Sequence, residues 1–244
     1  FQDLASDRAA YRLADQFDQD VLGYLSGYKQ SALHGTANAV NTTVNGSVAV
    51  STAATNELLA SMQVDAADFN SGTSGNSIVA VPRASGDSLN TTTAKASPLS
   101  IIARMSRKLD QQNVDTTGRW LVVDPVFAEL LQDEDSRLLN SDYGGSGLQN
   151  GLILNNVHGF KVYMSNNLPA VGNGATGATS TGSTHFGVIV GGHSSAVATA
   201  DSINKTETYR DPDSFADIVR GMHMYGRKIL RPEALTRAIY VSGI

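Results

Sequence analysis

The sequence predicts an α+β fold. Three observations support this class: a long amphipathic helix opens the chain, two capped helices follow near its middle, and short strands joined by hairpins alternate with them. Strands that alternate with helices but also connect through tight turns are typical of α+β proteins. With 244 residues, 41% of them hydrophobic, the chain is long enough to bury a core in one large or two smaller lobes.

The opening helix is predicted over residues 3–28. Carboxylates at Asp3 and Asp7 lie in its first turns, where they interact favourably with the helix dipole. A helix of this length would measure about 39 Å, so we expect other elements to line up along it. An ordinary long core helix is the alternative interpretation. The apolar residues recur at spacings of three and four, which places them on one stripe: Leu4, Ala10, Leu13, Ala14, Phe17, Val21, Leu25 and Tyr28.

Residues 29–94 are rich in Ser, Thr, Asn, Gly and Ala. Short apolar segments interrupt them at 48–50, 58–62 and 78–81. Such a composition fits either an ordered insertion of loops and short strands or a partly disordered segment.

A second helix is predicted over residues 97–112, because Ser97 is a good N-cap and Pro98 suits the first helical position. Its apolar face carries Leu99, Ile102, Ala103 and Leu109. The opposite face is basic, and a solvated face is the default interpretation. A sharper hypothesis pairs this face with acidic residues of the first helix, in the same or a neighbouring subunit; the residues are Arg104, Arg107 and Lys108 against Asp15, Asp18 and Asp20.

The middle of the chain predicts a strand at 119–123, followed by a third helix that Asp124 and Pro125 begin in the same way. Two strands, 151–157 and 160–165, are joined by His158-Gly159 as a two-residue hairpin turn. Glycine-rich tips are predicted at 143–147 and 172–184.

The last part of the chain is the densest in predicted structure. A strand at 185–190 leads to a short helix at 194–200. Strands then follow at 202–210, 215–229 and 238–242, separated by turns at the proline-containing segments 211–213 and 231–233.

Composition excludes several classes of function. The chain has no cysteine, so disulfides, thiolate metal sites and thiol nucleophiles are all ruled out. A net charge of -5 argues against a general affinity for nucleic-acid phosphates, which requires clustered Lys and Arg. No apolar run approaches the roughly 20 residues of a membrane helix, so no membrane partner is expected.

Motifs for chemistry give no support to an enzyme. Residues 172–177 match GxGxxG but lack the flanking strand and helix of a dinucleotide site. Residues 221–228 resemble a P-loop only superficially, since Arg227 takes the lysine position and Lys228 the hydroxyl position. We therefore predict no catalytic, cofactor-binding or metal-binding residue. The histidines are scattered, without metal-ligand spacing, and those at 158 and 223 are expected to be structural: His34, His158, His185, His193 and His223.

Three stretches together resemble one family. Residues 209–240, YRDPDSFADIVRGMHMYGRKILRPEALTRAIY, are similar to the C-terminal part of tailed-bacteriophage major capsid proteins of the Hong Kong 97-type fold. GRWLVVDPVFAELL at 118–131 and NGLILNNVHGFKVYMSNNLP at 150–169 resemble the same family, as does the opening helix. Together these segments cover more than a third of the chain.

The resemblance implies a long spine helix beside a β-sheet in a peripheral domain, and an axial domain at the centre of a capsomer. On this basis residues 1–112 and 201–244 are expected to form the peripheral domain and 113–200 the axial domain. The family's N-terminal arm and extended loop are not recognisable before the helix, and residue 1 is Phe rather than Met. A removed leader or a missing upstream segment would explain this, and no lysine–asparagine cross-link can be assigned.

The function implied by the resemblance is that of a non-enzymatic structural subunit of an icosahedral bacteriophage head. It would assemble with itself into pentamers and hexamers that enclose double-stranded DNA, contacting that DNA without sequence specificity. Portal, scaffold and decoration proteins would be its other partners, the virion its location and the bacterial cytoplasm its place of assembly. Three alternatives stay open: an encapsulin-type nanocompartment shell, a soluble α+β enzyme or sugar-binding module, and a surface or tail adhesin.

Overall fold

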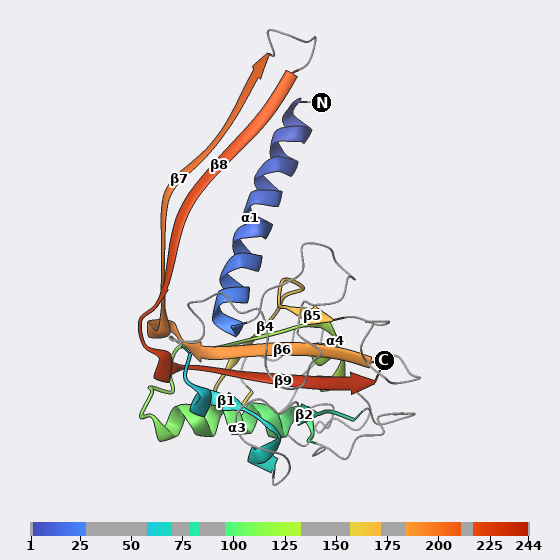
Figure 1. Cartoon of the computed structure of the whole chain (residues 1–244), viewed down its shortest axis with the longest axis vertical. Coiled ribbons are helices and arrows are strands. Elements are labelled where there is room, and N and C mark those ends of the chain that lie inside the picture. Colours follow the sequence, from blue (N-terminus) through green and yellow to red (C-terminus); the bar gives the residue numbers. More distant parts are fainter. Residues whose placement is uncertain are drawn as a thin grey trace.

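The computed structural model describes residues 2–27, 58–69, 79–82, 96–132, 157–171, 184–210 and 217–243. These residues form two parts of different shape (Figure 1). We call the seven-stranded sheet with its packed helices the base, and the long helix with the two-stranded hairpin that rises beside it the stem. The predicted α+β class is confirmed, because helices and largely antiparallel strands occur in both parts.

The base sheet is organised around its two longest strands, which pair antiparallel along their length: β6 (Thr184–His193) and β9 (Leu235–Gly243). Beyond β6 the order continues through β3 (Arg119–Val123) to β4 (Lys161–Met164), and β5 (Ala170–Val171) also pairs with β6. Two short strands from the Ser/Thr/Asn-rich segment pair parallel with the other edge of β9: β1 (Gln63–Val64) and β2 (Val79–Ala80). The apolar segments of residues 58–81 therefore complete the sheet.

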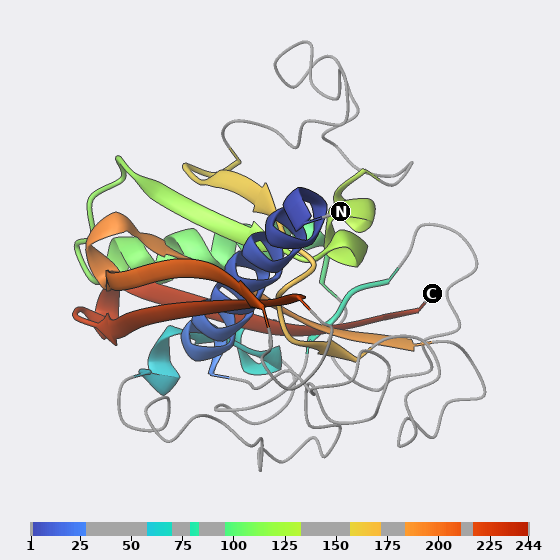
Figure 2. The same cartoon turned by 90° about the horizontal axis from the view of Figure 1, so that it is seen from above.

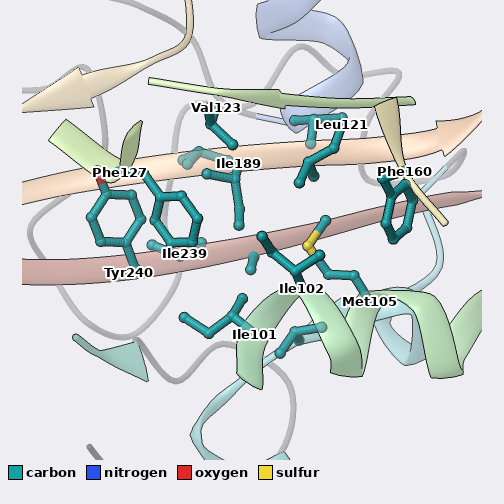
Figure 3. Packing of buried hydrophobic residues seen from close by; sticks show 14 of the residues in the cluster. Ile101, Ile102, Met105, Leu121, Val123, Phe127, Phe160, Ile189, Ile239 and Tyr240 are labelled. Atoms are coloured by element: carbon teal, nitrogen blue, oxygen red, sulfur yellow. The ribbon is translucent and has the colours of Figure 1, made fainter. Parts of the chain in front are cut away.

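Helix α3 (Pro98–Gln111) covers one face of this sheet, and α4 (Pro125–Leu131) follows β3 directly. Ile101, Ile102 and Met105 of α3 point at the strands, where Leu121, Ile189 and Ile239 form the opposite side of the core (Figure 3). All of these side chains are buried. Filling a core this completely is what lets the base fold as a unit.

A buried arginine ties α3 to the start of β3. Arg119 is 2% exposed and donates to Asp110 Oδ1 at 2.7 Å and to the carbonyl oxygen of Val114 at 2.6 Å. Its Nε also donates to the carbonyl oxygen of Asp115 at 2.8 Å. A buried charge is tolerated when its donors are satisfied in this way, so Arg119 fixes the connection from helix to strand.

The stem consists of α1 (Gln2–Ser26), β7 (Val197–Arg210) and β8 (Asp217–Ile229). The two strands pair antiparallel along their whole length, with an irregularity between Asp201 and Ile203. Figure 1 shows the hairpin leaving one end of the base and running beside α1, whose N-terminus lies toward the hairpin tip. Figure 2, seen from above, shows α1 and the hairpin overlying the base.

Both capped helices are confirmed. Ser97 Oγ accepts from the Ser100 amide at 3.3 Å, and Asp124 Oδ1 accepts from the Phe127 amide at 3.3 Å. The turn at His158-Gly159 is confirmed as well: φ is 49° and 87° at these residues, and Val157 pairs with Phe160 across them. Positive φ at both central residues is the geometry of a type I′ hairpin turn.

The helix predicted at 194–200 is wrong. Only Ser194–Ala196 form a single 3₁₀ turn (η5), and β7 begins at Val197, which pairs with Ile229. A helix of seven residues has little stability of its own, so pairing along the full hairpin prevails. The strand predicted at 151–156, the tips at 143–147 and 172–183 and the turn at 211–213 lie outside the described residues.

The predicted pairing between the basic face of α3 and the acidic residues of α1 is wrong within the chain. Arg107 and Lys108 instead lie 3.2 and 3.1 Å from the carboxylate of Asp68, which belongs to η2 (Ala66–Phe69). Arg104 lies over the Phe69 ring at 5.5 Å. The segment at 58–69 lies beside α3 because β1 pairs with β9. Asp68 of this segment, and not a carboxylate of α1, is therefore the partner of Arg107 and Lys108.

Candidate assembly surface

The stem is held together by a line of aromatic contacts between α1 and β8. The Phe17 ring meets Tyr225 edge-on, with centroids 4.7 Å apart, and lies 5.3 Å from the ring of His223. His223 Nε2 is 3.0 Å from Asp201 Oδ1 on the neighbouring strand. His223 is therefore a structural residue of the stem, as the sequence predicted.

Below this line, Asp20 of α1 is the main polar contact. The Tyr225 hydroxyl donates to Asp20 Oδ2 at 2.7 Å, and Arg227 forms an ion pair with the same oxygen. The guanidinium of Arg227 also lies 4.8 Å from the Tyr24 ring centre. Desolvation lowers the pKa of Arg227, and the contacts on both sides hold its charge in place.

Hydrogen bonds join α1 of the stem to the base. Arg237 of β9 donates to the carbonyl oxygen of Ser26 at 2.9 Å, where α1 ends. Asn167 Nδ2 donates to Asp15 Oδ1 at 2.9 Å. The helix is thus anchored at its last turn and at one point of its lower half.

Burial along α1 is uneven. Tyr24 and Leu25 are 5% and 4% exposed, whereas none of residues 7–19 is buried and Tyr11 is 70% exposed. A long helix usually buries a continuous apolar stripe. Among the residues that the structure describes, the upper part of this one meets no core.

Burial along β8 alternates between two faces. His223, Tyr225 and Arg227 face α1 and are partly buried, whereas Met222 and Met224, between them, are 52% and 53% exposed. We call the side opposite α1 the outer face of the hairpin. Within the part of the chain that the structure describes, no helix or strand packs against it (Figure 1).

Charged side chains surround the two methionines on the outer face. Lys205 and Arg220 both pair with Glu207, and Arg220 also lies 5.1 Å from the Tyr209 ring centre. Hydrogen bonding from Lys205, and next from Arg220, lowers the pKa of Glu207. The outer face is therefore a mixed apolar and charged surface, and its Met, Tyr and Arg side chains are of the types enriched in protein interfaces.

A buried polar cluster lies at the start of α4. Asp124 is 2% exposed, accepts from the Tyr240 hydroxyl at 2.7 Å and lies 2.6 Å from His185 Nε2. Desolvation raises the pKa of Tyr240 well above its usual value, and the negative charge of Asp124 adds to the effect. His185 and Tyr240 are buried too, at 6% and 0% exposed, so the cluster joins three elements and offers no open site.

The remaining residues tested in the sequence do not form a site in the described ranges. Residues 221–228 lie in a strand, so the P-loop interpretation stays rejected. His158 lies in its turn, and His193 caps the 3₁₀ turn by accepting from the Ser195 amide at 3.1 Å. His34 and the GxGxxG run at 172–177 lie outside the described residues. Among the described residues no three His, Asp or Glu side chains group together as metal ligands, and no helix is long and apolar enough to cross a membrane.

The outer face is the surface that sequence reasoning missed. The signal for it was present: Met222 and Met224 alternate with His223 and Tyr225, so the two kinds of side chain lie on opposite sides of a strand. The sequence predicted the strand but could not say which neighbour covers which side.

Comparisons with known proteins agree on one family. A family model described as phage capsid protein matches residues 63–238. A solved structure from Mycobacterium phage Che8 is 25% identical, with a TM-score of 0.56 over 97% of this chain and 61% of that one. The capsid structure of the cyanophage P-SCSP1u is 17% identical, with a TM-score of 0.57 over 98% of this chain and 66% of that one. The chain thus spans 61% and 66% of these two structures. No curated protein matches the sequence.

Proposed function

The chain belongs to the phage capsid protein family and has the Hong Kong 97-type fold, and from this premise we propose that it is a structural subunit of an icosahedral bacteriophage head. Its function would then be self-association, with heterologous contacts around five- and six-fold centres that close into a shell. No enzymatic role is part of this proposal.

The observation that carries the proposal is the incomplete stem. A two-stranded hairpin is at best marginally stable by itself, and α1 covers only one of its faces. The upper part of α1 also remains exposed. Neighbouring copies would complete this surface, and many weak contacts repeated over a shell would together give a stable particle.

We propose a domain division that refines the one expected from the sequence. Strand β9 pairs with β6 throughout, and α3 packs on the same sheet, so both join residues 113–196 in an axial domain formed by the base. The peripheral domain would be the stem, with α1 as its spine helix.

The partners and location proposed for the subunit follow from the same role. Copies of the chain would form pentamers and hexamers of the virion shell, assembled in the cytoplasm of the bacterial host. Portal, scaffold and decoration proteins would contact the shell, and packaged DNA would be touched without reading its sequence, as the net charge of -5 favours.

The nanocompartment alternative is disfavoured by the family match, and the enzyme, sugar-binding and adhesin alternatives have no supporting observation in the described residues. Electron microscopy of particles from the expressed full-length protein tests the proposal. Closed shells of uniform size are expected. A protein that remains monomeric under every assembly condition would refute it, and shells that enclose a cargo protein instead of DNA would restore the nanocompartment.

A further inference from the structure

We propose that the outer face of the stem hairpin is the docking surface for helix α1 of a second copy of this chain. The contact would be made by one exposed stripe of α1, formed by Asp7, Tyr11, Ala14 and Asp18. This inference rests on the proposed self-association and specifies which two surfaces of the subunit meet.

The stripe is a continuous line on the helix. Its members are spaced by four, three and four residues, which brings them to one side of an α-helix. All four are exposed, and Tyr11 is 70% exposed. Phe17 and Asp20 lie on a different side and contact the hairpin of the same chain, so the stripe remains accessible when the stem is formed.

The outer face complements the stripe in charge. It presents Lys205, Arg220 and Lys228 against one carboxylate, Glu207, whereas the stripe presents two carboxylates and no cation. A positive surface that meets a negative one favours this pairing over contact between two copies of the same face.

The order of groups along the two surfaces also corresponds. Asp7 and Asp18 are about 16 Å apart along the helix, with Tyr11 and Ala14 between them. Cations flank the two methionines of the outer face: Lys205 lies opposite Met222, and Lys228 lies about 20 Å further along, with Met224 between them. Tyr11 can therefore pack on the methionines, a favourable sulfur–aromatic contact, while the carboxylates reach the flanking cations.

A glycine on the outer face gives an independent indication. Gly226 lies within β8, and a Cβ atom added to it would meet nothing within 4 Å. Its own chain therefore does not require a glycine for space, and its φ is not in the left-handed region. Glycine inside a strand often marks the close approach of another backbone. Gly226 lies opposite Ala200, so this part of the face would let a neighbouring helix approach closely.

Such a contact is heterologous, because each copy offers a stripe on one side of the stem and a face on the other. It can therefore repeat from copy to copy, as a shell requires. In the assembled shell the hairpin would lie between two helices, one from its own chain and one from the neighbouring copy.

Cross-linking between two single-cysteine variants tests the proposal directly, because the chain has no cysteine of its own. Tyr11→Cys protein would be co-assembled with Met222→Cys protein, and separately with Met224→Cys protein, and treated with a bismaleimide of about 10 Å, the spacing of packed layers. We expect cross-linked dimers in at least one mixture and none from any single variant alone. The control replaces Tyr11→Cys by Gln16→Cys, which is equally exposed but lies about 140° around the same helix.

Each other outcome decides the matter. Closed shells without dimers in either mixture, or with as many dimers from Gln16→Cys, would overturn the docking proposal and leave the capsid function intact. Dimers formed by Met222→Cys or Met224→Cys protein without Tyr11→Cys protein would show that two outer faces meet each other, which would also overturn the docking proposal. If no particles form, the proposed function fails and this inference fails with it.

Gly226→Tyr provides a second test. The side chain has open space in a single copy, so the thermal midpoint of the unassembled protein should not change. It would occupy the space for the neighbouring helix, and we expect at least a tenfold loss of particle yield. Normal shells at an unchanged midpoint would overturn the proposal, and if the variant folds poorly the cross-link decides.

Discussion

The base and the stem use similar elements but complete them differently. In the base, α3 buries four of its side chains against the sheet. The strands of that sheet contribute further buried side chains, among them Leu121, Val188 and Val190. In the stem, a helix nearly twice as long buries only its last turn, and the sheet beside it has two strands instead of seven. The comparison teaches that the described part of the chain buries the helix of the base, whereas it leaves most of the helix of the stem and one face of its hairpin uncovered.

The largest effect is expected from Asp124→Ala in the base. The substitution removes the N-cap of α4 and leaves the Tyr240 hydroxyl and His185 without their buried acceptor. Each buried donor left without its acceptor costs about 1–3 kcal/mol and the lost cap about 1 kcal/mol, so the free energy of unfolding in urea should fall by at least about 3 kcal/mol. Asp18→Ala in the stem is the matched control and should change that free energy by less than about 0.5 kcal/mol. Equal losses at both sites would contradict the distinction between the two parts.

Gly187→Ala tests how tightly the base is packed. A Cβ atom at this position would lie 2.5 Å from Cε1 of Tyr240, whose ring is fully buried. Overpacking of this kind costs about 1–3 kcal/mol of unfolding free energy, and thermal or chemical denaturation would measure it. The matched glycine in the stem is Gly226, where alanine meets nothing within 4 Å. A loss there as large as at Gly187 would show that the outer face is already covered within one chain.

Phe17→Ala should loosen the stem and leave the base unchanged. It removes the ring contacts to Tyr225 and His223 that hold α1 against β8. An aromatic pair contributes about 0.5–1.5 kcal/mol beyond its buried area, so amide hydrogen exchange in β8 should accelerate up to about tenfold. Amides of β6 serve as the internal control. Equal acceleration in both strands would mean that stem and base open together.

The smallest effect concerns pH. The pKa of Tyr240 is raised in the folded state, so its contribution to stability is complete below pH 10, the usual tyrosine value, and is lost as the pH rises further. Over the first pH unit above that value the loss should be less than about 1.4 kcal/mol. Tyr240→Phe cannot ionise there, so the stability difference between the two proteins should shrink with rising pH. A constant difference would refute the assignment.

Local signals in the sequence predicted much of the fold. The caps at Ser97 and Asp124 located α3 and α4, because a side-chain acceptor followed by proline defines a helix start within four residues. The spacing of Phe17 and Val21 likewise predicted α1 over nearly its observed length. The one helix predicted wrongly, at 194–200, was the shortest and had no cap-and-proline signal.

Long-range partners could not be predicted in the same way. Asp68 lies 40 residues from Lys108 in sequence and within salt-bridge distance in space, which no local pattern indicates. The outer face was missed for a related reason. Its alternation predicts a strand with two unlike sides, but only the position of α1 shows that the methionines are on the uncovered one.

The sequence by itself determined where the long helix, the two capped helices and the long strands of the described residues lie, and its three family-like stretches indicated a phage capsid subunit. Only the tertiary structure decided how these elements divide between a closed base and an open stem. The reason is that capping and periodicity act over a few residues, whereas burial depends on which distant strands and helices meet, here β9 with β6 and α1 with β8.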